Sequence, residues 1–281
     1  AEDGIRDRSP SRGLGDVYKR QDSACAILAA PPGKMLAIIG GSGLTQLSSL
    51  EVNRREIVRT PYGEPSGALL FGRIGAQDVV FLARHGFGHT IPPHDVNYCA
   101  NIAGLRQVGA TRVVSVASVG GIRADLGPGT LLVPHQIIDY TWGRKMTFHE
   151  GADAPVTHID FTDPYDAALR AQLLAAAAAI GEAIVDGGVY AATQGPRLET
   201  AAEINRLERD GADVVGMTGM PEAALAREAG LAYAAIAVVA NFAAGRGESS
   251  HGIEFARIEA TLQAAMGRVR LVLIKLCETG A

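Results

Sequence analysis

Four apolar, strand-like segments of this chain each end in side chains that can hold an anion. These side chains are Ser42 in a glycine-rich turn, Arg84 with His85, Ser118, and Thr218. Hydroxyls, a guanidinium and backbone N–H groups beside glycines are donors that bind phosphate oxygens. In open α/β sheets, ligands lie outside the carboxyl ends of the strands. We therefore expect the four segment ends to converge on one oxyanion site.

Taken alone, each of these groups also has a purely structural interpretation. The turn Gly40–Gly43 is consistent with a plain connection, and its spacing does not give the dinucleotide fingerprint G-x-G-x-x-G. Arg84 is consistent with a surface arginine beside a capping histidine. The histidines His85, His89 and His94 cross a Gly/Pro-rich loop without the helical spacing or paired carboxylates of a metal site, so we expect no metal.

A second set of candidate residues follows later strand-like runs. The run AIAVVAN predicts a buried strand that ends in the amide of Asn241. The motif GMTGMPE predicts a strand that delivers Met217 and Thr218, followed by a helix with Pro221 in its first turn, where a missing N–H costs nothing. Glu199 lies just before another predicted helix, where a carboxylate also favours the helix N-terminus.

Strand-like runs alternate with segments of helical spacing from residue 35 onward. The predicted strands cover 35–40, 78–83, 112–118, 130–140 with a break at Pro134, 187–194 and the run that ends at Asn241. The predicted helices cover 94–108, 166–180, 200–209, 221–229 and 254–276. This alternation predicts an α/β fold with a largely buried sheet. No linker or internal repeat follows Met35, so we predict one domain over residues 35–281.

The first 34 residues differ from the rest of the chain. They have no hydrophobic period and mix charges with Gly and Ser. A short apolar run after Arg20 weakly resembles a secretion signal, but Asp22 interrupts it. We expect residues 1–34 to be disordered or a non-native leader and exclude them from the fold.

The composition argues against several classes of protein. The net charge is −4 and there is no basic stripe, so we expect no nucleic-acid partner. No apolar run reaches the length of a membrane span. Cys25, Cys99 and Cys277 lie far apart, which indicates free thiols in a reducing compartment and predicts a cytoplasmic location.

Six motifs together resemble the trimeric purine nucleoside phosphorylases and methylthioadenosine phosphorylases. They are AIIGGSGL, FLARHG, PPHDVNYCAN, SVGGI…LGPGTL, TQGPRLET and VGMTGMPEAALARE, and the likeness spans residues 35–276. The resemblance implies the nucleoside phosphorylase fold, a single α/β/α domain with a mixed, twisted central sheet. It also implies a homotrimer that cleaves a purine nucleoside with inorganic phosphate as co-substrate, without an organic cofactor or a metal.

The resemblance also implies roles for individual residues. Phosphate would meet Ser42, Arg84, His85, Ser118 and Thr218. Met217 would lie against the ribose, and Leu198 takes the position of an aromatic residue that usually covers the purine. Asn241 and Glu199 would hold the base, with Asn241 and His85 as the catalytic residues. His158 would reach the 5′ pocket of a neighbouring subunit.

Departures from the family pattern bear on the substrate. Adenine-specific members carry acids at the positions of Asn241 and Ala243 and a small hydroxyl residue at that of Glu199. The base site therefore resembles that of 6-oxopurine phosphorylases, while GMTGMPE, GPRLE and PPHDVNY resemble the methylthionucleoside branch. S-methyl-5′-thioinosine is the expected substrate, with inosine, guanosine or methylthioadenosine as alternatives. The sequence leaves the 5′ substituent of the substrate undecided, because the segment 242–255 places either His251 or Ile253 near it.

Two functions from other classes compete with this interpretation. A nicotinamide-dependent oxidoreductase would use the first glycine turn for its cofactor. A non-catalytic nucleoside-binding protein would bind a purine nucleoside without releasing the base.

A further departure from the family is Ala117, which replaces a polar residue that often contacts phosphate.

Overall fold

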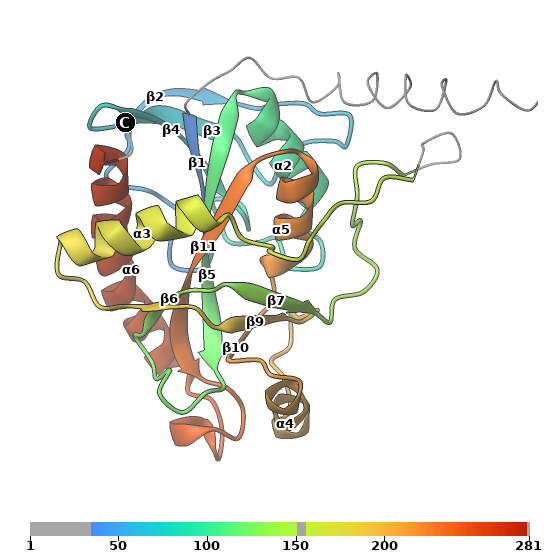
Figure 1. The fold of residues 1–281 in the computed structure, drawn as a ribbon, viewed down its shortest axis with the longest axis vertical. Helices are drawn as coiled ribbons and strands as arrows, with labels where there is room; N and C mark the ends of the chain where they lie inside the picture. The colour runs from blue at the N-terminus through green and yellow to red at the C-terminus, as the bar shows by residue number, and fades with distance from the viewer. Residues whose placement is uncertain (1–34, 151–155, 280–281) are drawn as a thin grey trace, which may run out of the picture.

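The computed structural model describes residues 35–150 and 156–279. Parallel strands form the centre of a mixed sheet (Figure 1). Strand β1 (Met35–Gly40) lies between β4 (Gln77–Ala83) and β5 (Ala110–Gly121), and β11 (Ala232–Phe242) pairs with the other edge of β5. All of these pairs are parallel, so the carboxyl ends of the four strands open at the same edge of the sheet.

Shorter strands extend the sheet in both directions. On one side, β3 (Leu69–Ile74) and β2 (Glu51–Glu56) add antiparallel to β4. On the other, β10 (Val214–Gly216) runs antiparallel to the end of β5 and parallel to β9 (Val189–Ala192), which pairs with β7 (Gln136–Asp139). A branch through β11 adds β6 (Leu131–Val133) and β8 (Ile184–Asp186).

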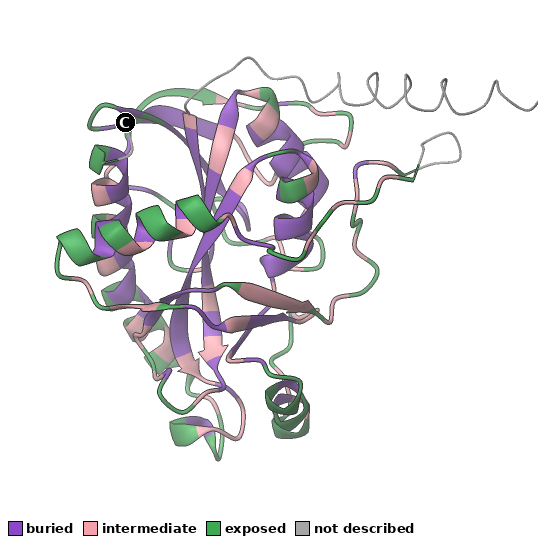
Figure 2. Ribbon diagram, viewed as in Figure 1, coloured by how far each residue is buried: buried purple, intermediate pink, exposed green. Residues whose placement is uncertain are grey.

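Helices cover both faces of this sheet (Figure 1). Helices α2 (Tyr98–Gln107) and α5 (Gly219–Glu228) pack on one face, and α3 (Ala167–Ala179) and α6 (Phe255–Thr279) pack on the other. Each face has its own cluster of buried apolar side chains. Figure 2 shows β5 and β11 buried along most of their length between these layers. The expected α/β/α architecture with a mixed central sheet is confirmed.

Most predicted elements are present, with shifts at their ends. The helix expected from residue 94 begins at Tyr98, because Asn97 caps it and accepts a bond from the backbone N–H of Ala100. Met220 departs from helical geometry (φ −118°, ψ 140°), so the regular part of α5 begins at Pro221, as expected. Strands β2, β3 and β8 were not predicted.

Two further sequence predictions concern the leader and membrane-crossing helices. The leader over residues 1–34 lies outside the described residues, so its expected disorder stays a prediction. Within the described ranges, no helix combines the length and the hydropathy that crossing a membrane requires.

Candidate active site

A cavity of about 660 Å³ opens at the carboxyl ends of the central strands. The predicted site residues that line it are Ser42, Arg84, His85, Ser118, Leu198, Glu199, Met217, Thr218, Asn241 and Ala243. These residues lie near the carboxyl ends of six different strands or in the loops that follow them, which is why one cavity collects side chains about 200 positions apart in the sequence. His158 is the one predicted site residue outside this lining; it is exposed, in the segment before α3.

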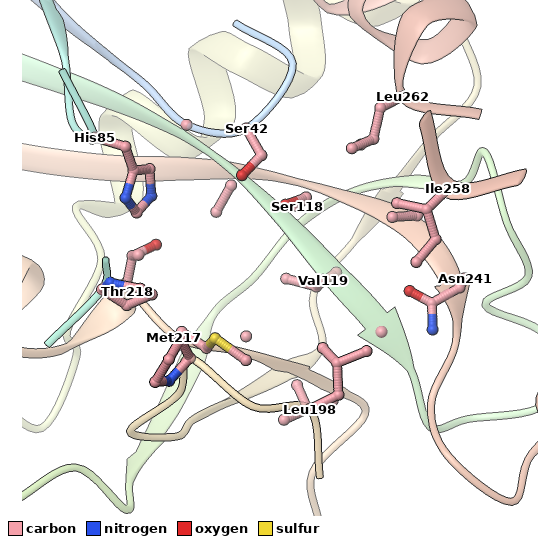
Figure 3. Close-up of a pocket in the computed structure, with 18 of the residues that line it drawn as sticks. Ser42, His85, Ser118, Val119, Leu198, Met217, Thr218, Asn241, Ile258 and Leu262 are labelled. Atoms are coloured by element: carbon pink, nitrogen blue, oxygen red, sulfur yellow. The ribbon is translucent and has the colours of Figure 1, made fainter. Parts of the chain in front are cut away.

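Polar groups suited to an oxyanion lie at one side of the cavity. Figure 3 shows Ser42, His85 and Thr218 there, with Ser118 on β5 between them and the opposite side. Thr218 is the residue before α5, and its hydroxyl makes no capping bond to that helix. The helix therefore does not use this hydroxyl, and Thr218 lines the cavity.

Arg84 is buried beneath these groups rather than exposed at the surface. Its side chain is 1% exposed and forms a bidentate ion pair with Glu222, from Nε at 2.6 Å and from Nη2 at 2.9 Å. Nη2 also donates to the hydroxyl of Ser115, and Nη1 donates to the carbonyl of Val116. Four of the five guanidinium N–H groups are thus used. The bidentate partner in the structure is a carboxylate of the protein, which leaves one N–H of Nη1 for a ligand.

The Arg84 pair is part of a larger buried network. Glu222 is fully buried and also accepts bonds from the hydroxyls of Ser115 and Tyr233, both at 2.8 Å. Burial alone would lower the pKa of Arg84, but the adjacent carboxylate outweighs it and raises that pKa, so Arg84 stays charged. A Cβ at Gly41 would lie 2.8 Å from Nη1, so the glycine turn approaches Arg84 as only glycine allows.

His85 is neutral at physiological pH. Burial and the charge of Arg84 lower its pKa to about 4. Its Nδ1 lies 2.8 Å from the carbonyl oxygen of Ile91, which can only accept, so Nδ1 carries the proton and Nε2 is left as an acceptor. Such an acceptor suits the hydroxyl of a ribose or of a protonated phosphate.

His89 also belongs to the site, although sequence reasoning considered it only as a metal ligand. Its ring meets that of His85 edge to face, with centroids 4.9 Å apart, and its Nε2 lies 3.4 Å from the hydroxyl of Ser42. It has a positive φ of 52°, which is uncommon for a residue other than glycine. Within the described ranges, no cluster of three or more His, Cys, Asp or Glu side chains is arranged to hold a metal ion.

Asn241 lines the cavity away from the oxyanion side, and Glu199 belongs to the same lining. Figure 3 shows Asn241 and Leu198 across the cavity from His85 and Thr218. The amide nitrogen of Asn241 donates to the carbonyl of Phe242 at 2.6 Å, which leaves one N–H and the amide oxygen for a ligand. A break in register between Val239 and Asn241 turns this end of β11.

Glu199 is not the cap of the following helix. Helix α4 (Ala201–Arg209) is capped by Thr200, which forms a capping box with Glu203. Thr200 and Glu203 therefore fill the capping role, and Glu199 is not needed for it. Its carboxylate instead accepts a bond from the hydroxyl of Thr193 at 2.6 Å.

Apolar side chains complete the lining. Met217 and Leu198 lie along one wall, and Ala243 is a buried residue of the lining. A further apolar wall comes from α6 and the segment before it, and it consists of Ile253, Phe255, Ile258 and Leu262. Of the two residues that the sequence left open for this region, Ile253 lines the cavity and His251 does not.

Comparison with known proteins identifies the family. A sequence model of the Phosphorylase superfamily matches residues 35–278. The chain therefore belongs to the phosphorylase superfamily and is an enzyme of that group.

Individual relatives are similar over most of the chain. A probable S-methyl-5′-thioinosine phosphorylase of Pseudomonas syringae pv. tomato is 55% identical over 240 residues, which covers 85% of this chain and 97% of the relative. The 6-oxopurine nucleoside phosphorylase of Pyrococcus furiosus is 46% identical over 215 residues, which covers 75% and 80%. The structure of methylthioadenosine phosphorylase from Schistosoma mansoni in complex with adenine is similar with a TM-score of 0.83 and 32% identity, over 88% of this chain and 91% of that one.

Proposed function

We propose that this enzyme cleaves 6-oxopurine nucleosides with inorganic phosphate. The preferred substrate is S-methyl-5′-thioinosine, and the products are hypoxanthine and 5-methylthioribose 1-phosphate. One observation carries the proposal: Glu199 and Asn241 line the same cavity as the oxyanion-suited groups Ser42, Ser118 and Thr218. Similarity to relatives named as S-methyl-5′-thioinosine and 6-oxopurine nucleoside phosphorylases supports it.

The proposed reaction is a displacement at the anomeric carbon. A phosphate oxygen forms a bond to that carbon while the bond to the purine nitrogen breaks, and the base leaves with the electron pair. Phosphate would be held by Ser42, Ser118, Thr218 and the free N–H of Arg84, with Met217 against the ribose. Positioning and stabilisation of charge on the leaving base supply the rate enhancement.

The base would be recognised by complementary hydrogen bonds. A 6-oxopurine carries a hydrogen on ring nitrogen 1, which the carboxylate of Glu199 accepts. The N–H of Asn241 that Phe242 leaves free donates to ring nitrogen 7 or to the 6-oxo group, both of which are acceptors, and the amide does not change charge with pH. Leu198 would cover the purine face in place of an aromatic ring.

A second candidate function is that of an inosine or guanosine phosphorylase. Its substrates carry a 5′-hydroxyl where the proposed substrate carries a 5′-methylthio group. A 5′-hydroxyl needs a polar partner, whereas a methylthio group is stabilised by apolar contact. The apolar wall of Ile253, Ile258 and Leu262 favours the methylthio group. No cofactor other than the co-substrate phosphate is proposed.

We expect base release from S-methyl-5′-thioinosine to depend on phosphate. Release of hypoxanthine should rise with phosphate concentration and fall to background in phosphate-free buffer, because phosphate is the nucleophile. The coupled absorbance change of the freed base measures it, with arsenate as a substitute oxyanion for control. Equal rates with and without phosphate would identify a hydrolase, and binding without release would identify a nucleoside-binding protein.

We also propose that the enzyme is a cytoplasmic homotrimer in which His158 of one subunit reaches the 5′ pocket of the next. Its exposure and its absence from the cavity lining support a role outside its own subunit's cavity. His158→Ala should raise KM for the nucleoside by about tenfold, as expected for one lost contact. His94→Ala, at another exposed histidine outside the lining, is the matched control.

The shared site has a direct test by subunit mixing. His158→Ala and Asn241→Ala subunits, each impaired alone, should regain activity when they exchange, because some sites then combine two intact residues. Sedimentation velocity should give a trimer. A fully active monomer, or mixing without any gain, would rule out the shared site.

A further inference from the structure

Glu199 lies in a wall between two cavities. One is the cavity of the candidate active site, and the other, of about 400 Å³, is lined by Tyr140, Trp142, Thr193 and residues around α4. Glu199 lines both cavities, whereas Thr193 lines only the second. The two oxygens of the Glu199 carboxylate therefore have different surroundings.

Thr193 engages one of these oxygens. Its hydroxyl lies 2.6 Å from Oε1 of Glu199, closer than the 3.3 Å to its other acceptor, the carbonyl of Gly216. The backbone N–H of Thr193 donates to the same carbonyl at 2.8 Å, which fixes the residue at the end of β9. In the part of the chain that the structure describes, no hydrogen bond reaches Oε2. Oε1 is thus held by Thr193, a residue of the second cavity, and Oε2 is left without a partner among the described residues.

We infer that Thr193 is a positioning residue that makes the enzyme discriminate at position 2 of the purine. The inference rests on the proposed function, in which Glu199 faces the edge of the base. Hypoxanthine presents one N–H on that edge, at ring nitrogen 1, while guanine presents this N–H and a 2-amino group. Two parallel N–H bonds require both carboxylate oxygens to face the base. With Oε1 held by Thr193, one oxygen serves hypoxanthine fully and leaves the 2-amino group of guanine without its acceptor.

The test compares substrates that differ only at position 2. The ratio of kcat/KM for S-methyl-5′-thioinosine to that for S-methyl-5′-thioguanosine should favour the former in the wild type. Thr193→Val removes the hydroxyl at nearly equal volume and should shift the ratio toward the 2-amino substrate by about tenfold, the effect of one hydrogen bond to a charged group. Thr193→Ser keeps the hydroxyl and should keep the wild-type ratio.

A second variant and a second measurement guard against a folding defect. Thr193→Ala also removes the hydroxyl, and binding of hypoxanthine and guanine in the presence of phosphate, measured by calorimetry, needs no turnover. An unmoved ratio in both variants, or an equal shift in Thr193→Ser, overturns the role of Thr193 alone. A wild-type preference for 6-amino nucleosides contradicts the proposed function instead, and with it this inference.

Discussion

Replacing Arg84 with alanine should abolish phosphate-dependent base release and also destabilise the fold by about 3–5 kcal/mol. The loss of activity follows from the N–H of Nη1 that would serve phosphate. The loss of stability follows from Glu222, which would remain fully buried as an unpaired carboxylate. Chemical denaturation and the dependence of the initial rate on phosphate concentration measure the two effects separately.

A double variant separates the structural role of Arg84 from the role in phosphate binding. Arg84→Met with Glu222→Leu removes both charges, so it should recover most of the stability while phosphate use stays lost. Recovery would be incomplete, because the hydroxyls of Ser115 and Tyr233 lose their acceptor. Phosphate use that returns in the double variant would show that Arg84 only balances Glu222. Wild-type stability in Arg84→Ala would contradict the buried pair itself.

The Arg84 network shows which part of the site cannot be predicted from the sequence. The strand end at Arg84 was predictable, because an apolar run precedes a guanidinium and a glycine. Its partner was not, since Glu222 lies 138 positions later and looks like an ordinary acidic residue in the first turn of a helix. The packing of α5 against α2 and β11 in the fold brings the two charges together. The guanidinium of Arg84 therefore forms its bidentate pair with Glu222 of the protein.

The missed elements have physical reasons of their own. Strand β2 carries charged side chains and is exposed along nearly its whole length, so it has no hydrophobic period to detect. It is held by backbone pairing with β3 at the edge of the sheet. Strand β8 has three residues, which is too short for any period to be recognised. The buried central strands, by contrast, were readable as apolar runs.

The base site was predictable as a set of residues but not as a hydrogen-bond network. Asn241 ends an apolar run and Glu199 precedes a helix, so both were visible in the sequence. That Thr193 holds one oxygen of Glu199, and that Thr200 takes the capping role, depends on the turn between β9 and α4. The apolar wall contributed by α6 was missed, because its residues read equally well as core.

Exchanging the base-site residues should change which purine the enzyme accepts. The wild type should prefer S-methyl-5′-thioinosine over methylthioadenosine by orders of magnitude. Adenine has no hydrogen at ring nitrogen 1, so an ionised Glu199 would face a lone pair and remain unsatisfied. Asn241→Asp supplies an acceptor for the 6-amino group and should shift the ratio of kcat/KM toward methylthioadenosine by about 10–100-fold, from 1–3 kcal/mol for a satisfied polar group.

Ala243→Asp should add less to this shift than the sequence alone suggests. Ala243 is 3% exposed and packs in an apolar cluster with Ile122, Ile204 and Val215, so a carboxylate there is desolvated. The double variant Asn241→Asp with Ala243→Asp should therefore move toward 6-amino substrates at the cost of stability. Glu199→Gln offers an N–H to ring nitrogen 1 of adenine and should strengthen the shift in the Asn241→Asp background.

Steady-state kinetics with three nucleosides decide between the assignments. The substrates are S-methyl-5′-thioinosine, methylthioadenosine and inosine, and each variant is checked by thermal unfolding so that lost stability is not taken for altered specificity. A wild-type preference for methylthioadenosine would overturn the assignment of Glu199 and Asn241 to the base. A preference for inosine would overturn only the 5′ part, because the apolar wall of Ile253, Ile258 and Leu262 would then fail to select a methylthio group over a hydroxyl.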